Sequence, residues 1–328
     1  GFKGRKVVLY FYPKDDTSGC TLEAVTFTSL APEFEAAGAV IIGVSPDSVN
    51  ADDKFKAKHD LGVTLVSDEA HEAIDAYGLT FFKVKVSGVA DADIDRLCRV
   101  AAVIDAKVPS YSVTLDGNEQ FSSAEAVADL LARVKEEPRL ARFAASILFV
   151  EQPIARAHAF EKPVKVLAAF KPVEIDESDA DIDAFVTARG LGYSGISSKS
   201  CKGFYRSLLN RARVAQWSAE DGIAYFMSAE DLTTQGGLAV QQDLALASLI
   251  GMTHIERNGH HYVDGMAGAP EAEQAAFVEA HSDLYRISNG RTRLRIEAGQ
   301  LAIGSVVNSV GLGSSAEPDW AAMERSRM

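Results

Sequence analysis

Short apolar runs alternate with amphipathic stretches along most of the chain, and their order predicts two groups of β/α units. In the first group, apolar runs of strand length are separated by segments with helical periodicity. Because parallel strands need a crossover connection that a helix supplies, this order predicts a parallel sheet. The expected strands span residues 6–12, 39–47 and 63–68, and the expected helices span residues 21–38, 54–59 and 69–79.

The second group begins at residue 81 and continues the same alternation to residue 257. Each apolar run is followed by a stretch long enough for one helix and a return loop, which predicts a parallel (β/α) barrel. Short strands with turns are expected after it, over residues 284–304. The expected barrel strands span residues 81–87, 111–115, 147–151, 173–176, 193–199, 223–228 and 253–257.

Charged side chains stand at the ends of five of these runs, between 23 and 35 residues apart. In a closed parallel barrel the carboxyl ends of all strands meet at one mouth, so these side chains should converge there. Carboxylates are the ligands of a hard divalent cation such as Mg²⁺. Lysines beside such a cation suit removal of a proton next to a carboxylate. The side chains in question are Lys83, Lys85, Asp116, Glu151, Asp176 and Lys199.

In chain order the motifs are a KxK strand, a DxN strand end, an EQP strand end, a DES strand end and a strand-end lysine. Together they resemble the enolase superfamily, and within it the muconate-lactonizing-like branch of the mandelate racemase/muconate lactonizing enzyme family, from roughly residue 80 to residue 320. The resemblance implies a TIM-like barrel that lacks its first strand and its capping domain. It implies Mg²⁺ ligands at Asp116, Glu151 and Asp176. It also implies acid/base groups at Lys85 and Lys199, with Lys83 lowering the pKa of Lys85 by like-charge repulsion.

Several other polar residues near the strand ends need an interpretation. Lys202 stands beside Gly203 at the start of a helix and is expected to be solvated. Three histidines lack the carboxylate or cysteine neighbours of a zinc site, so we expect them at the surface or behind the metal ligands; they are His254, His260 and His261. The residues expected to touch substrate or to support the ligands are Asn118, Glu177, Ser228 and Glu230.

The first 79 residues carry a different motif, a Thr-Ser-Gly-Cys turn that ends at Cys20. A cysteine at a helix N-terminus is stabilised as thiolate by the helix dipole and the free N–H groups. With the surrounding sequence, this turn resembles peroxiredoxins of the bacterioferritin-comigratory type. The resemblance implies that Cys20 is the peroxidatic cysteine and that Thr17 hydrogen-bonds the sulfur or the peroxide.

The chain departs from that family in three respects. Ser18 stands where the family usually has proline, and Val25 stands where many relatives have a resolving cysteine. The family's peroxide-polarising arginine has no counterpart, since Arg5 lies at the wrong end of its strand. The resemblance also stops near residue 78, before the closing strands of the fold. We therefore expect a fusion of two partial genes.

Composition limits the partners. The formal net charge is −13 and no basic run is present, so nucleic acid is not expected as a partner. No apolar run reaches membrane-spanning length. Three cysteines in 328 residues favour a reducing, cytoplasmic setting. Of these, Cys98 and Cys201 are expected to be packing residues.

These patterns predict an α/β protein with a partial thioredoxin-like βαβ unit at residues 1–79 and an incomplete TIM-like barrel at residues 80–328. The first functional hypothesis is an Mg²⁺-dependent racemase, dehydratase or cycloisomerase that removes a proton from a small carboxylate-bearing substrate. The second is a thiol peroxidase that uses Cys20 and a thiol reductant. The third is an inactive fusion. The oligomeric state, including a homo-oligomer, is left open.

Overall fold

The computed structural model divides the chain into two compact units, Gly1–Tyr77 and Gly78–Met328. It describes residues 6–11, 15–16, 18–36, 39–45, 47–67, 77–231, 235–257, 265–311 and 313–322.

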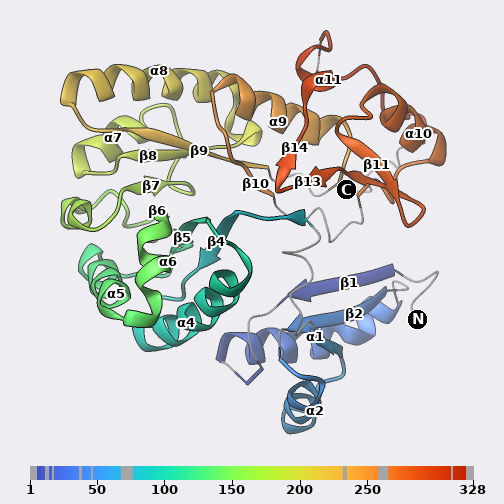
Figure 1. Ribbon diagram of the computed structural model, residues 1–328, viewed down its shortest axis with the longest axis horizontal. Helices are drawn as coiled ribbons and strands as arrows, with labels where there is room; N and C mark the ends of the chain where they lie inside the picture. Colours follow the sequence, from blue (N-terminus) through green and yellow to red (C-terminus); the bar gives the residue numbers. More distant parts are fainter. Residues whose placement is uncertain are drawn as a thin grey trace. The chain divides into compact units, whose positions relative to one another are not determined.

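The first unit is a small parallel sheet with helical crossovers (Figure 1). Its strands pair in the order β1-β2-β3, all parallel, which confirms the order predicted from the apolar runs. The elements are β1 (Lys6–Phe11), α1 (Ser18–Ala36), β2 (Ala39–Ser45), α2 (Val49–Lys58) and β3 (Thr64–Ser67). A separate apolar core holds them together, formed by Ala24, Ile41, Phe55, Leu61 and Val63.

The sequence predicted two further helices in this unit, over residues 54–59 and 69–79. Helix α2 begins several residues before the expected start at residue 54. The reason is a cap: the Ser48 hydroxyl accepts a hydrogen bond from the Ala51 N–H at 3.3 Å, which satisfies one of the open donors of the first turn. The helix expected over residues 69–79 lies almost entirely outside the described residues.

The second unit is built on a seven-stranded sheet in the order β10-β9-β8-β7-β6-β5-β4, with every pair parallel. This nearly closed, barrel-like sheet confirms the predicted (β/α) barrel, and among the described residues no strand lies beyond the KxK strand, which forms one edge as predicted. The strands are β4 (Phe81–Lys85), β5 (Ser112–Asp116), β6 (Ile147–Glu151), β7 (Val173–Ile175), β8 (Gly195–Ser198), β9 (Phe226–Asp231) and β10 (Glu256–Arg257).

Helices cover the outside of these strands (Figure 1). Helix α5 shows why: its buried residues Ala124, Val127, Leu130, Leu131 and Val134 recur at helical spacing and form one apolar face. The helices are α4 (Ala90–Lys107), α5 (Ala124–Glu136), α6 (Ala141–Ser146), α7 (Ala184–Leu191), α8 (Phe204–Asp221) and α9 (Leu238–Leu249). Single 3₁₀ turns add η1 (Pro138–Leu140), η2 (Lys165–Ala169) and η3 (Ser200–Lys202).

No strand pairing between β4 and β10 occurs among the described residues. Side-chain contacts join these two edges of the barrel sheet instead. The Lys83 ammonium donates to Glu256, which lies on the opposite edge strand. The Phe81 ring stacks on His254 with centroids 5.0 Å apart and planes within 7°. The seam of the barrel, defined here as the line between β4 and β10, is therefore closed by side chains.

A smaller C-terminal group follows the barrel strands, as the sequence predicted. Its apolar core includes Met266, Phe277, Leu284 and Tyr285 and is shared with α9 through Val240. Its elements are α10 (Glu271–Ala280), β11 (Tyr285–Ser288), β12 (Arg291–Leu294), β13 (Ile296–Glu297), β14 (Gln300–Leu301) and α11 (Gly304–Val307). Strands β11–β12 and β13–β14 form two antiparallel hairpins.

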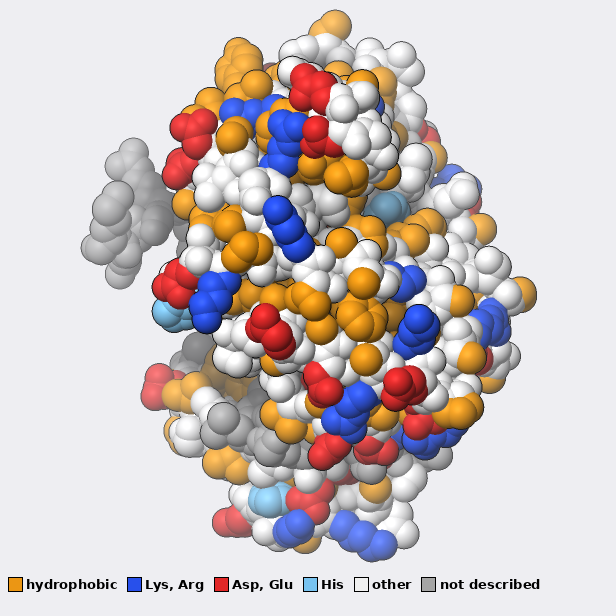
Figure 2. All heavy atoms as spheres, turned by 90° about the vertical axis from the view of Figure 1, so that its left-hand side faces the viewer, with side chains coloured by type: hydrophobic (Ala, Val, Ile, Leu, Met, Phe, Trp, Pro, Cys, Tyr) orange, Lys and Arg blue, Asp and Glu red, His pale blue; other side chains and the backbone are white. Residues whose placement is uncertain are grey.

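The net negative charge is not gathered on the face drawn in Figure 2. There, Lys and Arg side chains alternate with Asp and Glu side chains and with hydrophobic ones. In the ranges that the structure describes, no helix is both long and apolar enough to cross a membrane.

Candidate active site at the mouth of the barrel

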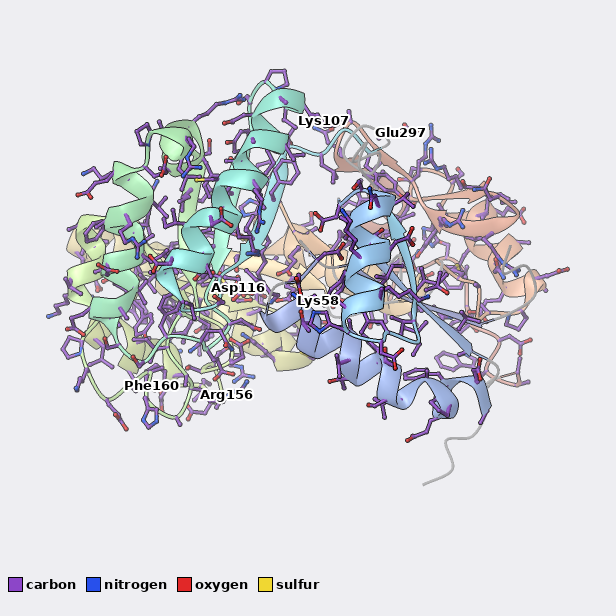
Figure 3. All side chains as sticks on the ribbon, turned by 90° about the horizontal axis from the view of Figure 1, so that it is seen from below. Lys58, Lys107, Asp116, Arg156, Phe160 and Glu297 are labelled. Atoms are coloured by element: carbon purple, nitrogen blue, oxygen red, sulfur yellow. The ribbon has the colours of Figure 1, made fainter. Side chains whose placement is uncertain are left out.

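The carboxyl ends of the barrel strands bring together the charged residues that the sequence singled out. Asp116 and Glu151 are the last residues of β5 and β6, and Asp176 directly follows β7. Figure 3 shows Asp116 and Arg156 at the opposite end of the β/α units from Lys107, where α4 ends. The site therefore lies at the end of the barrel where parallel (β/α) barrels carry their active sites.

One half of the site centres on Lys83. Its ammonium lies 2.8 Å from Glu151 Oε1 and 3.3 Å from Asp116 Oδ2, in addition to its contact with Glu256. Lys85 lies on the same face of β4 and donates to Asp116 Oδ2 at 2.7 Å. The two lysines differ in exposure: the Lys83 side chain is 14% exposed and that of Lys85 is 57% exposed. Lys85 is thus the lysine of this pair that a substrate can reach.

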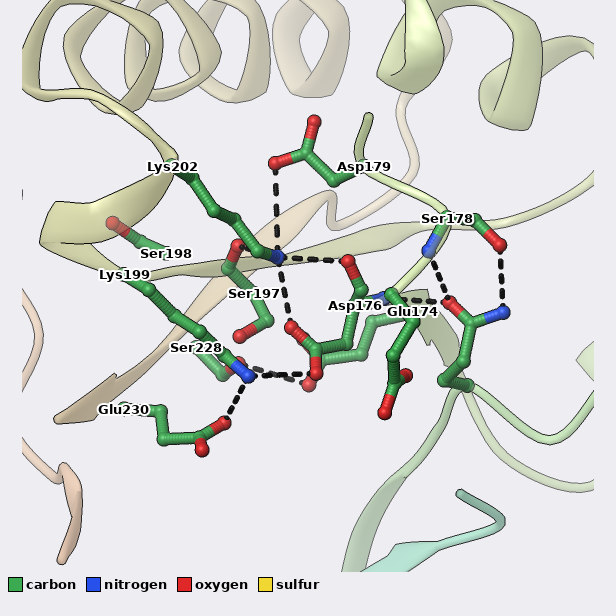
Figure 4. A network of polar contacts seen from close by, with 12 residues as sticks. Glu174, Asp176, Ser178, Asp179, Ser197, Ser198, Lys199, Lys202, Ser228 and Glu230 are labelled. Atoms are coloured by element: carbon green, nitrogen blue, oxygen red, sulfur yellow. Dashed lines mark hydrogen bonds and ion pairs between the residues drawn. The ribbon is translucent and has the colours of Figure 1, made fainter. Parts of the chain in front are cut away.

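The other half centres on Asp176 (Figure 4). Lys199 Nζ lies between two carboxylates, 2.8 Å from Asp176 Oδ2 and 2.6 Å from Glu230 Oε2. Lys202 Nζ donates to the other oxygen of Asp176 at 2.8 Å. It also donates to the backbone carbonyl oxygens of Asp176 and Ser197, at 2.8 and 3.0 Å.

The expectation of a solvated Lys202 is wrong. Its side chain is only 13% exposed, and its ammonium also lies 3.7 Å from Asp179. The physical reason is that Lys202 ends η3, the single 3₁₀ turn that directly follows β8, and its side chain extends to the buried carboxylates (Figure 4). A lysine in the first turn of a surface helix would have no such partners.

A buried side chain and a close backbone approach hold the strand ends in register. The buried Gln152 side chain accepts hydrogen bonds from the Asp176 and Ser178 N–H groups at 2.8 and 3.1 Å. Gly117 passes so close to the next loop that a Cβ atom there would lie 2.4 Å from Pro153 Cα. Sequence reasoning gave Gln152 no role of its own; its position directly after Glu151 was the available signal.

Burial and charge shift the pKa values of the carboxyl groups in opposite directions. Burial would raise the pKa of Asp176, but the ammonium groups of Lys202 and Lys199 outweigh it and lower the pKa to about 2. Burial raises the pKa of Glu151 to about 8, against the opposing charge of Lys83. Asp116 and Asp176 contribute to that rise by like-charge repulsion.

Lys83 and Lys199, two of the buried lysines, are held in the charged form by the carboxylates around them. Burial would lower the pKa of Lys83, but Glu151, Glu256 and Asp116 outweigh it and raise that pKa. Burial likewise opposes protonation of Lys199, and Asp176 and Glu230 raise its pKa. The carboxylates of the mouth therefore have built-in ammonium partners.

A group of three carboxylates could hold a cation. Oxygen atoms of Glu151, Asp176 and Glu230 all lie within 4.8 Å of one another, and all three residues are buried. Oxygen ligands of this number and charge fit a hard divalent cation. Glu151 and Asp176 belong to the ligand set expected from the sequence, whereas Glu230 was expected only to touch substrate or support the ligands.

The remaining candidates lie at the same mouth, in the first unit, or outside the described residues. Asn118 Nδ2 donates to Glu177 Oε1 at 3.1 Å, and the Ser228 hydroxyl donates to Glu174 at 2.8 Å. Cys20 lies in the first turn of α1. Those outside the described residues are Thr17, Arg5, His260 and His261.

Two cysteine expectations have different outcomes. Cys98 is buried, as expected, and burial raises the pKa of its thiol. The expectation that Cys201 is a packing residue is wrong, because this cysteine is exposed. It belongs to η3, whose turn directs Lys202 to the site and leaves Cys201 at the surface.

The chain combines similarity to two classes of protein. A model of the AhpC/TSA family matches residues 1–122. Peroxiredoxin Bcp of Bacillus subtilis is 50% identical over 76 residues, which cover 23% of this chain and 48% of the relative. The chain thus spans about half the length of the curated relatives it matches. Its first part is similar to bacterioferritin-comigratory peroxiredoxins, as the sequence analysis expected.

Solved structures similar to the barrel come from the other class. The muconate lactonizing enzyme of Pseudomonas putida is 20% identical with a TM-score of 0.43, covering 57% of this chain and 49% of that one. A mandelate racemase/muconate lactonizing protein from Herpetosiphon aurantiacus is 21% identical with a TM-score of 0.47, covering 71% and 60%. Both resemblances expected from the sequence recur in these comparisons.

Proposed function

We propose that the barrel is an enzyme that removes a proton adjacent to a carboxylate group, with the help of a divalent cation, which we take to be Mg²⁺. The observation that carries the proposal is the meeting of buried carboxylates with lysines from opposite sides of the mouth. Lys85 comes from β4 and Lys199 directly follows β8. Such a pair suits acid/base chemistry on the two faces of one substrate.

The contacts of each residue indicate its role in the proposed reaction. Glu151 and Asp176 would hold the cation, because both are buried and belong to the group of three close carboxylates. Lys83 is held by carboxylates on both sides, so we assign it to charge balance and not to proton transfer. Asn118, Glu177 and Ser228 would position substrate or the ligands through their hydrogen bonds.

Lys85 or Lys199 would accept the substrate proton on Nζ in its neutral form, and the opposite lysine would return one. For Lys199 this requires release from Asp176 and Glu230, whose carboxylates raise its pKa. A bound divalent cation would fix the substrate carboxylate and stabilise the charge that develops on it. Racemisation, β-elimination and cycloisomerisation all begin with this proton removal, so the proposal covers the three reaction types. The substrate class is a small molecule that carries a carboxylate.

Exchange of the substrate α-proton in D₂O, followed by NMR over a panel of small carboxylic acids, tests the proposal. Lys85→Ala and Lys199→Ala should each abolish exchange for one enantiomer and leave cation binding intact. Lys135→Ala, at an exposed position on α5, is the control and should exchange normally. Equal exchange in both active-site variants and in the parent would exclude the two-lysine mechanism.

A second candidate function belongs to the first unit: a thiol peroxidase. It is favoured by 50% identity to a peroxiredoxin together with the place of Cys20 in the first turn of α1. The Cys20 thiolate would attack a peroxide oxygen, become sulfenic acid and release an alcohol or water; a thiol reductant would then restore it. A reducing, cytoplasmic setting would supply that reductant.

Alkylation rates distinguish an activated thiolate from an ordinary one. Cys20 should react with iodoacetamide at pH 7 faster than the exposed Cys201, and Cys98 should react slowest because it is buried. Equal rates at Cys20 and Cys201 would count against the peroxidase. A chain without proton exchange and without a reactive Cys20 would fit an inactive fusion instead.

A further inference from the structure

We infer that His281 is an acid-sensitive switch that holds a C-terminal strap against α11 at neutral pH and releases it in acid. The strap is defined here as residues 313–316, which follow α11 in the chain. It stays in place while the imidazole is uncharged and opens when the imidazole takes up a proton. The inference concerns the C-terminal group and does not depend on the proposed function of the barrel mouth.

The ring of His281 connects the strap to α11. This residue directly follows α10 and is 0% exposed. The backbone N–H of Ser315 donates to its Nε2 at 3.0 Å, and the Ser314 hydroxyl oxygen lies 3.1 Å from the same nitrogen. On the other side of the ring, Nδ1 lies 2.9 Å from the hydroxyl oxygen of Ser305, which belongs to α11. Each nitrogen atom thus contacts a different segment.

These partners fix the protonation state of the ring. A backbone N–H can only donate, so Nε2 must be the acceptor and carries no proton. The single proton of a neutral imidazole is then on Nδ1, and the Ser305 hydroxyl oxygen accepts it. The Ser305 hydroxyl in turn donates to Asp283 Oδ1, and its backbone N–H donates to Asp283 Oδ2 at 2.9 Å. The closed strap therefore requires a neutral His281.

A second proton on the ring would oppose the closed strap. It would lie on Nε2 and face the Ser315 N–H, so that two donors would meet and the backbone hydrogen bond would be lost. The Ser314 hydroxyl oxygen can accept this proton, but that bond replaces the one to Ser315 and adds none. Burial lowers the pKa of His281, and the nearby Asp283 carboxylate opposes this effect in part.

The surroundings of the ring offer little charge to stabilise an imidazolium. In the part of the chain that the structure describes, Asp283 is the one charged group that acts on it, and both Asp283 oxygens already accept hydrogen bonds from Ser305. Helix α10 contributes the ring of Phe277, whose centroid lies 6.4 Å away. Helix α11 and the strap contribute hydroxyl and backbone groups. A proton on the buried ring is therefore poorly compensated.

The strap covers apolar surface of the C-terminal group. Ala316 is 7% exposed and belongs to its apolar core. A Cβ atom at Gly313 would lie 3.5 Å from Val306 Cγ1 and 3.8 Å from Ala245 Cβ, so the strap passes directly over α11 and α9. Release of the strap would uncover apolar side chains on both helices.

Hydrogen exchange of the strap amides in the full chain, compared at roughly pH 7.5 and pH 5.5, tests the inference. After division by the intrinsic exchange rate, protection should fall about fivefold to tenfold, because opening takes up one proton below the ordinary histidine pKa of about 6.5. His281→Gln keeps an oxygen that can accept the Ser315 N–H but cannot titrate, so its protection should change by less than about twofold. His158→Gln, at an exposed histidine, is the matched control and should behave as the parent.

Two results in this comparison would overturn the inference. One is equal protection of the parent strap at both pH values, and the other is the same pH-dependent loss in His281→Gln as in the parent. If His281→Gln fails to fold, titration of the parent decides, by exchange of the histidine C2 protons followed by mass spectrometry. His281 should then titrate below the ordinary value of about 6.5, and a midpoint at or above that value would overturn the inference.

Discussion

At the scale of single residues, Asp176 shows how the mouth balances charge. Each of its two carboxylate oxygens is held by a different lysine, Lys199 on one side and Lys202 on the other. Because both lysines are largely buried, each ammonium is needed to offset the desolvation of the carboxylate. Removing one partner would leave the other charge uncompensated.

Lys202→Met should therefore lower the free energy of unfolding by about 3 kcal/mol, the usual cost of breaking a buried ion pair from one side. The measurement is urea unfolding at pH 7. Lys135→Met, at an exposed position on α5, is the control and should stay within about 0.5 kcal/mol of the parent. Equal small effects of both substitutions would show that Lys202 contributes no net stability.

Tyr193 gives a prediction for alkaline pH. Burial raises the pKa of this phenol to about 12; its side chain is 1% exposed and its hydroxyl donates to the Ala159 carbonyl oxygen at 3.1 Å. A pKa above the unfolded value of about 10 means that stability is fully present below pH 10 and is lost as pH rises through 12. Between pH 9 and pH 11.5 the parent should lose about 2 kcal/mol more than Tyr193→Phe.

Urea unfolding of both proteins across that range measures the difference directly. Other groups that ionise in alkali are common to the two proteins and cancel in the comparison. Parallel stability curves would mean that the phenol ionises equally in the folded and unfolded chains.

The residue scale also shows what the sequence could and could not predict. The residues at strand ends were predictable because strand periodicity and chain spacing place them at one mouth. Lys202, Gln152 and Glu174 were not, because their roles depend on how η3 folds back and on which strand neighbours meet in three dimensions. Cys201 was misjudged for the same reason: one turn of 3₁₀ helix decides which of its residues points inward.

At the scale of elements, the contact between β8 and β9 sets a tight limit on side-chain volume. A Cβ atom at Gly195 would lie 2.2 Å from the Phe226 ring. At Gly190, in helix α7, a Cβ atom would meet nothing within 4 Å. The same substitution should thus have opposite effects at two glycines only five residues apart.

Gly195→Ala should destabilise the barrel by about 1–3 kcal/mol, because the ring or the strand must move. Gly190→Ala should be neutral or stabilising by about 0.5–1 kcal/mol, because alanine favours a helix interior. Thermal unfolding followed by circular dichroism compares the two variants under one set of conditions. A Gly195→Ala protein as stable as the parent would show that Phe226 relaxes without cost.

Element type was predictable where the periodicity was long and clear. All seven barrel strands and the amphipathic α5 follow from their patterns of apolar residues. Boundaries were less predictable, since a capping hydrogen bond such as that of Ser48 extends α2 by several residues beyond its apolar stretch. The short turns η1, η2 and η3 carry too few residues for a periodicity to appear.

At the scale of the whole molecule, the two units have separate apolar cores. Phe55 is 2% exposed and belongs to the core of the first unit, whereas the barrel packs around different residues such as Leu130 and Phe185. Phe55→Ala should cost the first unit about 3–5 kcal/mol and leave Mg²⁺ affinity unchanged. Hydrogen exchange should show lower protection of β2, with β5–β8 unaffected.

Phe204→Ala, at a 47% exposed ring on α8, is the control and should leave protection of β2 as it is in the parent. Loss of protection in β5–β8 on Phe55→Ala would mean that the two units unfold together.

The side-chain closure of the barrel has a mechanical consequence. Backbone hydrogen bonds join all the other neighbouring strands from β4 to β10, whereas among the described residues side-chain contacts alone join β4 to β10. The seam is therefore the weakest junction of the barrel. Under a pulling force the ring should therefore open first between Phe81 and His254, and between Lys83 and Glu256. Since Lys83 also holds Glu151, opening the seam would disturb the mouth of the barrel at the same time. A ligand that binds only the intact mouth would therefore raise the force needed to open the seam.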